Sequence, residues 1–135
     1  MFRISRASGD VVIWKQGVID MEFSGFRRAD GRVGTRNYVG IVSTVVCANE
    51  VADGISRQIQ GTACFMHQQG CCQTPVDIER VNDTLAGLGQ NPNLASVLLV
   101  SLGCESTGVE DVANRIAAAG KRVETVVIQE SGGAA

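Results

Sequence analysis

The stretch HQQGCC, at positions 67–72, holds the single histidine of the chain beside two of its five cysteines. Imidazole and thiolate groups can bind a transition metal, form a redox pair or supply a nucleophile, and this stretch alone does not choose among the three. Two further stretches carry side chains of the same kinds. TVVCAN contains Thr44 and Cys47, and LGCES contains Cys104 and Glu105.

The cysteine spacing excludes two common thiol sites. No CxxC pair occurs, so the sequence contains neither a zinc ribbon nor a thioredoxin-like motif. Cys71 and Cys72 are adjacent and would form a strained disulfide, which ranks a redox pair last. A site for iron or zinc, with ligands from several loops, remains open. So does the alternative that each cysteine fills space in the core, and Cys64 is the strongest candidate for that role.

β-Branched apolar runs alternate with helical patterns from residue 38 onward. Strands are predicted at 38–46, 62–67, 95–103 and 123–130, and helices at 48–60, 74–89 and 107–120. Thr74 is the predicted N-cap of the second helix, with Pro75 at its first position, and Thr107 with Glu110 has capping-box spacing. The β-α-β-α-β-α-β order predicts a three-layer α/β domain with a parallel four-stranded sheet, Rossmann-like or flavodoxin-like.

The chemically interesting residues follow the predicted strands. TVVCAN, HQQGCC, GCES and QESGG each come at the end of a strand. Because ligands of open parallel sheets bind outside the carboxyl ends of the strands, all four clusters are expected on one rim. His67 is favoured for a site role there. Glu105 could be a ligand or a general base, or could merely cap a helix.

Composition and charge narrow the class of partner. Twelve basic and fourteen acidic side chains give a net charge of −2, and aromatic residues make up 4% of the chain. These values favour neither nucleic acid nor a membrane surface as a partner. No signal-peptide-like or membrane-spanning run is present, so we expect a cytoplasmic protein with reduced thiols. The glycine-bearing loops match neither GxGxxG nor a Walker A motif.

The first 37 residues break the alternating pattern. Residues 1–24 are predicted to be a leader, in which 10–14 and 17–23 could pair as a hairpin. The next stretch contains an Asp-Gly turn at 30 and 31 and arginines at 27, 28, 32 and 36. Such cations could hold a carboxylate-rich substrate, but a solvated linker that contacts a neighbouring domain is the preferred interpretation. The glycine-rich end ESGGAA suggests a piece of a longer protein.

Several stretches in order resemble the altronate/galactarate dehydratase family. They are GFRRADGRVGTRNYVGI, TVVCAN, HQQGC, TLAGLGQNPN, LGCE and VIQESGG. The resemblance is to the second, central domain of those enzymes and covers residues 25–135. It implies a hydro-lyase that converts an aldonate or aldarate to a 2-keto-3-deoxy acid and uses a divalent metal, usually described as iron. A related branch eliminates sulfite from sulfolactate, and HQQGC matches the dehydratase branch better.

The resemblance also implies roles for individual residues. Cys47, His67, Cys71 and Cys104 match as candidate ligands of Fe(II), and His67 and Glu105 as candidate catalytic groups. Arg32, Arg36, Asn37 and Thr44 become candidates for substrate binding or domain contact. Cys72 lies outside the motif.

Two functions from different classes follow. The first is the central domain of a sugar-acid dehydratase that needs the remaining domains or a partner subunit, and is inactive alone. The second is a non-catalytic assembly module or one subunit of a split lyase. A homo-oligomer is compatible with either.

Overall fold

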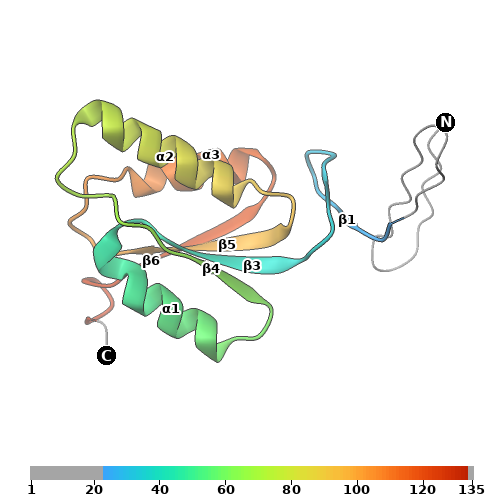
Figure 1. The fold of residues 1–135 in the computed structure, drawn as a ribbon, viewed down its shortest axis with the longest axis horizontal. Helices are drawn as coiled ribbons and strands as arrows, with labels where there is room; N and C mark the ends of the chain where they lie inside the picture. Colours follow the sequence, from blue (N-terminus) through green and yellow to red (C-terminus); the bar gives the residue numbers. More distant parts are fainter. Residues whose placement is uncertain (1–22, 134–135) are drawn as a thin grey trace.

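Four parallel strands form the centre of the structure, a computed structural model that describes residues 23–133 (Figure 1). Their order across the sheet is β4-β3-β5-β6. In chain order they are β3 (Tyr38–Ser43), β4 (Thr62–Phe65), β5 (Leu94–Ser101) and β6 (Arg122–Val127). All three pairings are parallel, which confirms the predicted fold class.

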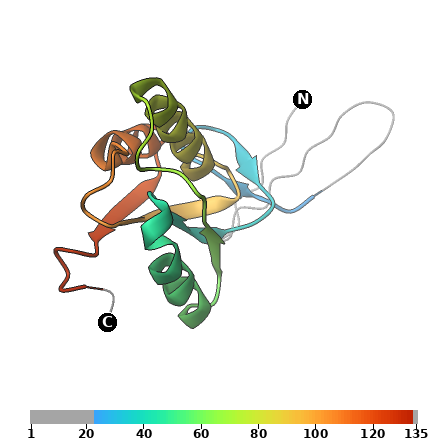
Figure 2. The ribbon, with the colours of Figure 1, turned by 60° about the vertical axis from the view of Figure 1, so that its left-hand side comes forward.

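Helices cover both faces of this sheet. They are α1 (Asn49–Gln58), which follows the short 3-10 helix η1 (Val46–Ala48), α2 (Pro75–Gly89) and α3 (Val109–Ala118). Helix α1 lies on one face, against β3 and β4, whereas α2 and α3 lie side by side on the other (Figures 1 and 2). No helix within residues 23–133 is both long and apolar enough to cross a membrane.

The alternation of side chains along β3 divides the core in two. Val42 packs beneath α2 and α3 with Leu85, Leu99 and Ile116. Ile41 points to the opposite face, and its cluster includes Val45, Ala48, Ala52 and Val100. Successive strand residues face opposite sides of a sheet, so the continuous apolar run of β3 is explained by burial on both faces. Cys64 packs against the second cluster, in agreement with its predicted core role.

Most element ends differ from the predictions by one to three residues. The first strand stops at Ser43 rather than at residue 46, because the chain turns into η1 there. Thr74 does cap α2, accepting a hydrogen bond from the Asp77 N–H. The capping box at Thr107 is wrong: Gly108 is the N-cap of α3, without a side-chain cap bond, and the Thr107 hydroxyl donates to the Thr44 carbonyl at 2.8 Å instead.

A small hairpin precedes the sheet. Strands β1 (Phe26–Arg27) and β2 (Val33–Gly34) pair antiparallel, and the predicted Asp-Gly turn lies between them, with Gly31 at φ +84°. Positive φ suits glycine because it has no Cβ. The hairpin predicted from 10–14 and 17–23 lies outside the described residues, apart from Phe23.

Cations from this hairpin hold the loop that joins α2 to β5. Arg28 Nε donates to the Pro92 carbonyl at 2.6 Å, and Arg32 Nη2 donates to the Gln90 carbonyl at 2.7 Å. Buried Lys121 donates to the carbonyls of Asn91, at 2.6 Å, and Leu94. Carbonyls just past a helix C-terminus lack helical partners and carry partial negative charge, so cations stabilise them. Burial, followed by the charges of Arg28 and Arg32, lowers the pKa of Lys121 to about 8.

Asn93 gives this loop its second anchor, and its loss should be measurable. Its side-chain oxygen accepts from the N–H of Thr35 at 2.9 Å and from that of Arg36 at 3.2 Å. We expect Asn93→Ala to lower the free energy of unfolding by about 1 kcal/mol, as measured by urea denaturation. Asn93→Asp keeps the acceptor oxygen and is the matched control. An alanine variant as stable as the aspartate variant would contradict the anchoring role.

Candidate functional site

The chain reverses direction across the sheet between β3 and β5. From β3 it passes through α1 to β4 on one side, then returns through α2 to β5 on the other. In parallel sheets a ligand crevice forms at such a point, outside the carboxyl ends of the two central strands. Thr44 follows β3 and Glu105 follows β5, so both predicted site residues lie at this crevice.

Glu105 and Thr44 join the two sides of the crevice. Thr44 is fully buried, and its hydroxyl donates to Glu105 Oε1 at 2.6 Å. The backbone N–H of Leu102 donates to the same oxygen at 3.2 Å, and that of Gly103 donates to Oε2 at 2.7 Å. With its hydroxyl committed to Glu105, Thr44 supports the crevice in this conformation and does not face a ligand.

These donors keep Glu105 ionised. Burial alone would raise the pKa of its carboxyl, but hydrogen bonds from the Thr44 and Ser101 side chains and from backbone N–H groups outweigh it and lower the pKa to about 2. So acidic a carboxyl is a poor general base near neutral pH. The geometry therefore indicates that Glu105 has a structural role and links the loop after β3 to the loop after β5.

His67 has both ring nitrogens engaged. Nδ1 accepts a hydrogen bond from the Gln69 N–H at 3.1 Å, and Nε2 lies 2.9 Å from the Ser43 carbonyl oxygen. An Nδ1 that accepts leaves the proton on Nε2, which then donates to Ser43. The ring is thus held as one neutral tautomer between the ends of β3 and β4.

Asn49 and Gly70 position the loop that carries His67. Buried Asn49 accepts from the Ser43 hydroxyl at 2.5 Å and donates to the His67 carbonyl at 2.9 Å. Gly70 lies against the backbone of Thr44 and Val45, and its carbonyl accepts from the Ser106 N–H at 2.9 Å. The sequence places Asn49 at the end of a strand but gives no sign of its bridge. It likewise does not reveal how closely Gly70 approaches Thr44.

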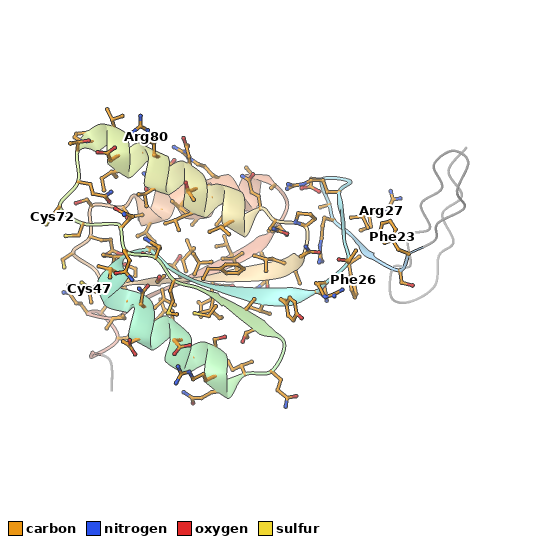
Figure 3. The ribbon with its side chains drawn as sticks, viewed as in Figure 1. Phe23, Phe26, Arg27, Cys47, Cys72 and Arg80 are labelled. Carbon is orange, nitrogen blue, oxygen red and sulfur yellow. The ribbon has the colours of Figure 1, made fainter. Side chains whose placement is uncertain are left out.

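The predicted thiols are exposed along the same rim. Cys47, Cys71, Cys72 and Cys104 are all exposed and free. Cys47 at the start of the α1 segment and Cys72 in the loop before α2 lie at one end of the molecule (Figure 3). The sulfurs of Cys71 and Cys72 are 3.6 Å apart. The hydrogen bond between these two thiols raises the pKa of Cys72. The charge of Cys71, burial and the charge of Cys47 raise it further.

The predicted substrate-binding arginines lie elsewhere. Arg32, Arg36 and Asn37 precede β3, whereas Thr44 follows it. Six residues of strand separate them, about 20 Å at about 3.3 Å per residue. Asn37 accepts from Arg28 Nη1 at 2.8 Å, and Arg32 pairs with Asp30. A single small sugar acid therefore cannot contact both the residues that precede β3 and the rim that follows β3 in the same chain.

The predicted metal ligands share the rim without converging on a point. Among residues 23–133, no three or more His, Cys, Asp or Glu side chains lie close enough together to hold a metal ion. In that same range no buried side-chain nitrogen or oxygen lacks a hydrogen-bond partner. Together with the engaged nitrogens of His67, these observations mean that the four-residue donor set does not fit a metal in this conformation.

Two cavities open beside the crevice. One, of about 470 Å³, adjoins Glu105 and the start of α3, and its lining contains Glu110 and Asp111 but no cationic side chain. The other, of about 360 Å³, lies between the end of β4 and α2. Its floor is apolar, with Phe65, Val81 and Leu85, and His67 and Arg80 are among its polar residues. The acidic cavity would repel the carboxylate of a sugar acid.

Comparison with known proteins identifies the family to which this domain is similar. The family described as "D-galactarate dehydratase/Altronate hydrolase, second domain" matches residues 25–135. The (2R)-sulfolactate sulfo-lyase subunit beta of Chromohalobacter salexigens is 36% identical over 110 residues, which cover 82% of this chain and 28% of that protein. The altronate dehydratase of Escherichia coli K12 is also 36% identical, over 104 residues that cover 67% of this chain and 20% of the relative.

The galactarate dehydratase (L-threo-forming) of the same strain is 31% identical over 112 residues, which cover 67% of this chain and 21% of the enzyme. The chain therefore spans a fifth to a little over a quarter of the length of these relatives. No solved structure matches it. Equal identity to an altronate dehydratase and to a sulfo-lyase subunit does not rank the two branches.

Proposed function

We propose, since this chain belongs to the D-galactarate dehydratase/altronate hydrolase family and carries its second domain, that it is the central domain of a sugar-acid dehydratase. The reaction would be loss of water from an aldonate or aldarate such as altronate or galactarate, giving a 2-keto-3-deoxy acid. The observation that carries the proposal is the rim at the carboxyl ends of the strands, where the loops after β3, β4 and β5 meet around Thr44, His67 and Glu105.

His67 is the residue we assign to proton abstraction α to the substrate carboxylate. Its Nε2–H bond to the Ser43 carbonyl would keep the ring in place while Nδ1 exchanges the Gln69 N–H for the substrate proton. A ring held through one nitrogen is oriented for base catalysis at the other. The carboxylate of Glu105 is ionised and hydrogen-bonded, so it would hold the loops after β3 and β5 together and would not exchange protons.

Other polypeptide would supply the groups that bind the substrate carboxylate, since Arg80, the cation that lines the same cavity as His67, pairs with Asp77 at 3.1 Å. The cavity beside Glu105 is acidic, and Arg32 and Arg36 precede β3, at the opposite end of this strand from the rim. The matched segment covers 28% of the sulfo-lyase subunit and 20% of the altronate dehydratase. We therefore expect the isolated 135-residue chain to be inactive and to need further domains or a partner subunit.

A chimera tests the dehydratase proposal. Residues 25–135 would replace the matching segment of the E. coli altronate dehydratase, and keto-acid formation from altronate would be followed with Fe(II) present and absent. We expect activity in the chimera, none in the 135-residue chain, and a loss of about 10²- to 10⁴-fold on His67→Gln.

The controls separate folding from chemistry. Arg57→Gln, on the exposed surface of α1, is the matched neutral variant. A folded chimera without activity would contradict the dehydratase assignment, and full activity with His67→Gln would contradict the role of the imidazole. Turnover by the 135-residue chain at the rate of the whole enzyme would refute the need for other domains.

The proposed reaction also uses a divalent metal. Iron would act as a Lewis acid on the substrate oxygens. Cys47, His67, Cys71 and Cys104 do not form a site together in this conformation, and the roles proposed for His67 and Glu105 do not depend on a bound metal.

A split lyase is the second candidate. The match to a sulfo-lyase named as a beta subunit covers more of this chain than the match to the E. coli altronate dehydratase. A second chimera, in which residues 25–135 replace the matching segment of the sulfo-lyase beta subunit, distinguishes the two. It would be assayed for sulfite release from (2R)-sulfolactate. Sulfite production by this chimera, with no keto acid from altronate in the first chimera, would favour the split lyase.

A further inference from the structure

The two edges of the central sheet differ in chemistry. β6 forms one edge, where Arg122 and Glu124 pair at 3.1 Å and both side chains are largely exposed. Charged side chains at an edge discourage a further strand from pairing there. β4 forms the other edge, and its sequence TACF has no charged residue, no proline and no register shift against β3. The β4 edge therefore lacks the usual protection against pairing.

The backbone of β4 directs hydrogen-bonding groups away from the sheet. The Val39 N–H donates to the Gly61 carbonyl at 2.9 Å, and alternate residues of a strand bond to the same neighbouring strand. Thr62 and Cys64 lie out of phase with Gly61, so their N–H and C=O groups face away from β3. Within residues 23–133, β4 pairs with β3 alone. Two donors and two acceptors are therefore placed to pair with a further strand.

Apolar side chains and a cavity border the same edge. Ile59 precedes β4 and Met66 follows it, and the two side chains are 54% and 53% exposed. The cavity of about 360 Å³ between the end of β4 and α2 has its apolar floor of Phe65, Val81 and Leu85. Because β4 is the outermost strand, this cavity lies at the margin of the sheet (Figure 2). Such a floor suits an apolar side chain better than a sugar acid.

We infer that an extended segment of the same longer polypeptide pairs with β4 as a fifth strand and inserts an apolar side chain into this cavity. The matched segment is 28% of the sulfo-lyase subunit and 20% of the altronate dehydratase, so most of each relative lies outside this domain. The docked segment brings other polypeptide beside His67, which lines the same cavity. The inference rests on the proposed place of this domain in a longer protein, but not on the dehydration itself.

The short length of β4 favours a tethered segment over a second copy of this chain. Four residues span about 13 Å. Two independent chains lose translational and rotational freedom on association, and so short a contact offsets little of that cost. A covalently connected segment keeps a high local concentration at the edge and avoids most of it.

Hydrogen exchange at the amides of Thr62 and Cys64 tests the inference, because these N–H groups gain acceptors when a strand pairs with β4. Exchange is measured by mass spectrometry in the 135-residue chain and in the chimera with the E. coli altronate dehydratase. We expect both amides to exchange at least about 10-fold more slowly in the chimera. Thr125 on β6 is the internal control. The Ile128 N–H donates to the Ser101 carbonyl, so by alternation the Thr125 N–H also faces away from the sheet, and its exchange should be alike in both proteins.

Proline variants separate docking from folding. Cys64→Pro removes an N–H that faces away from β3, a position where an edge strand tolerates proline. The 135-residue variant should keep the circular dichroism spectrum of the parent, whereas in the chimera the Thr62 amide should lose its protection. Met66→Lys leaves the backbone intact, adds a charge beside the cavity and should reduce the same protection. Thr125→Pro is the matched control on β6 and should leave Thr62 protected in the chimera.

The inference is overturned if Thr62 and Cys64 exchange equally fast in the two proteins, or if neither edge variant changes their protection. It is also overturned if the 135-residue chain protects these amides increasingly at higher concentration, since a second copy would then be the occupant. If the chimera does not fold, the same comparison is made between the intact E. coli altronate dehydratase and its isolated matching segment. Because exchange reports pairing and not turnover, its failure is distinct from a loss of keto-acid formation.

Discussion

Replacing Gly70 by alanine should destabilise the fold by about 3 kcal/mol or more, among the largest effects of any single methyl group in this chain. Gly70 has φ +103°, a conformation that residues with a Cβ rarely adopt. The added carbon would also lie 2.5 Å from the Thr44 carbonyl oxygen and 2.8 Å from Val45 Cα. Both neighbours are backbone atoms at the end of the central strand, so neither can move without disturbing the crevice.

Two other glycines separate the components of this effect. Gly61 also has positive φ, +81°, but a Cβ there would meet no atom within 4 Å. Gly61→Ala should therefore cost only the backbone strain, about 1–2 kcal/mol. Gly54 lies within α1 with open space around it, and Gly54→Ala should stabilise by about 0.5–1 kcal/mol.

Urea denaturation of the three variants gives the ranking. If Gly70→Ala costs no more than Gly61→Ala, the close approach to Thr44 and Val45 is not rigid.

Local pattern determines much of this fold. The β-branched run at residues 38–46 predicts a central strand, which the structure has at Tyr38–Ser43, and Thr74 with Pro75 marks the start of α2. The failure at Thr107 has a physical reason. Its hydroxyl has a tertiary partner in the Thr44 carbonyl, and local capping rules cannot anticipate a competing acceptor 63 residues away.

The candidate site is predictable only in outline. Parallel topology places Thr44, His67 and Glu105 at one rim, as expected from their positions after strands. What each side chain does there depends on partners that are distant in sequence. Ser43 orients His67, and Thr44 fixes Glu105. The arginines illustrate the limit: the sequence leaves open carboxylate recognition or a linker that contacts a neighbouring domain, whereas in the structure Arg28 and Arg32 hold the carbonyls that follow α2.

Glu105→Gln should lower the free energy of unfolding by about 1.5–3 kcal/mol at pH 7, the usual range for hydrogen bonds to a charged group. Glutamine keeps one acceptor oxygen and replaces the other with an NH₂ group. Depending on its orientation, this NH₂ group faces either the donors of Thr44 and Leu102 or the N–H of Gly103. In both orientations a donor then faces a donor. Glu110→Gln, an exposed change in the first turn of α3, is the control and should cost well under 1 kcal/mol.

The pH dependence of this difference distinguishes a charge effect from a packing effect. The pKa of Glu105 is lowered in the folded state, from its usual 4.5 to about 2. The unfolded chain therefore binds the proton more readily, and the stabilisation is fully present above pH 4.5 and is lost as the pH falls toward 2. The gap between the parent chain and Glu105→Gln should narrow steadily across that interval, in urea denaturation at pH 7, 5, 4 and 3.

A gap that stays constant across this pH range would mean that the carboxyl titrates alike in the folded and unfolded chains, so that its charge contributes nothing to stability. The link that Glu105 makes between the loops after β3 and β5 would then not depend on ionisation. A narrowing gap instead leaves His67 as the proton-transfer group of this rim.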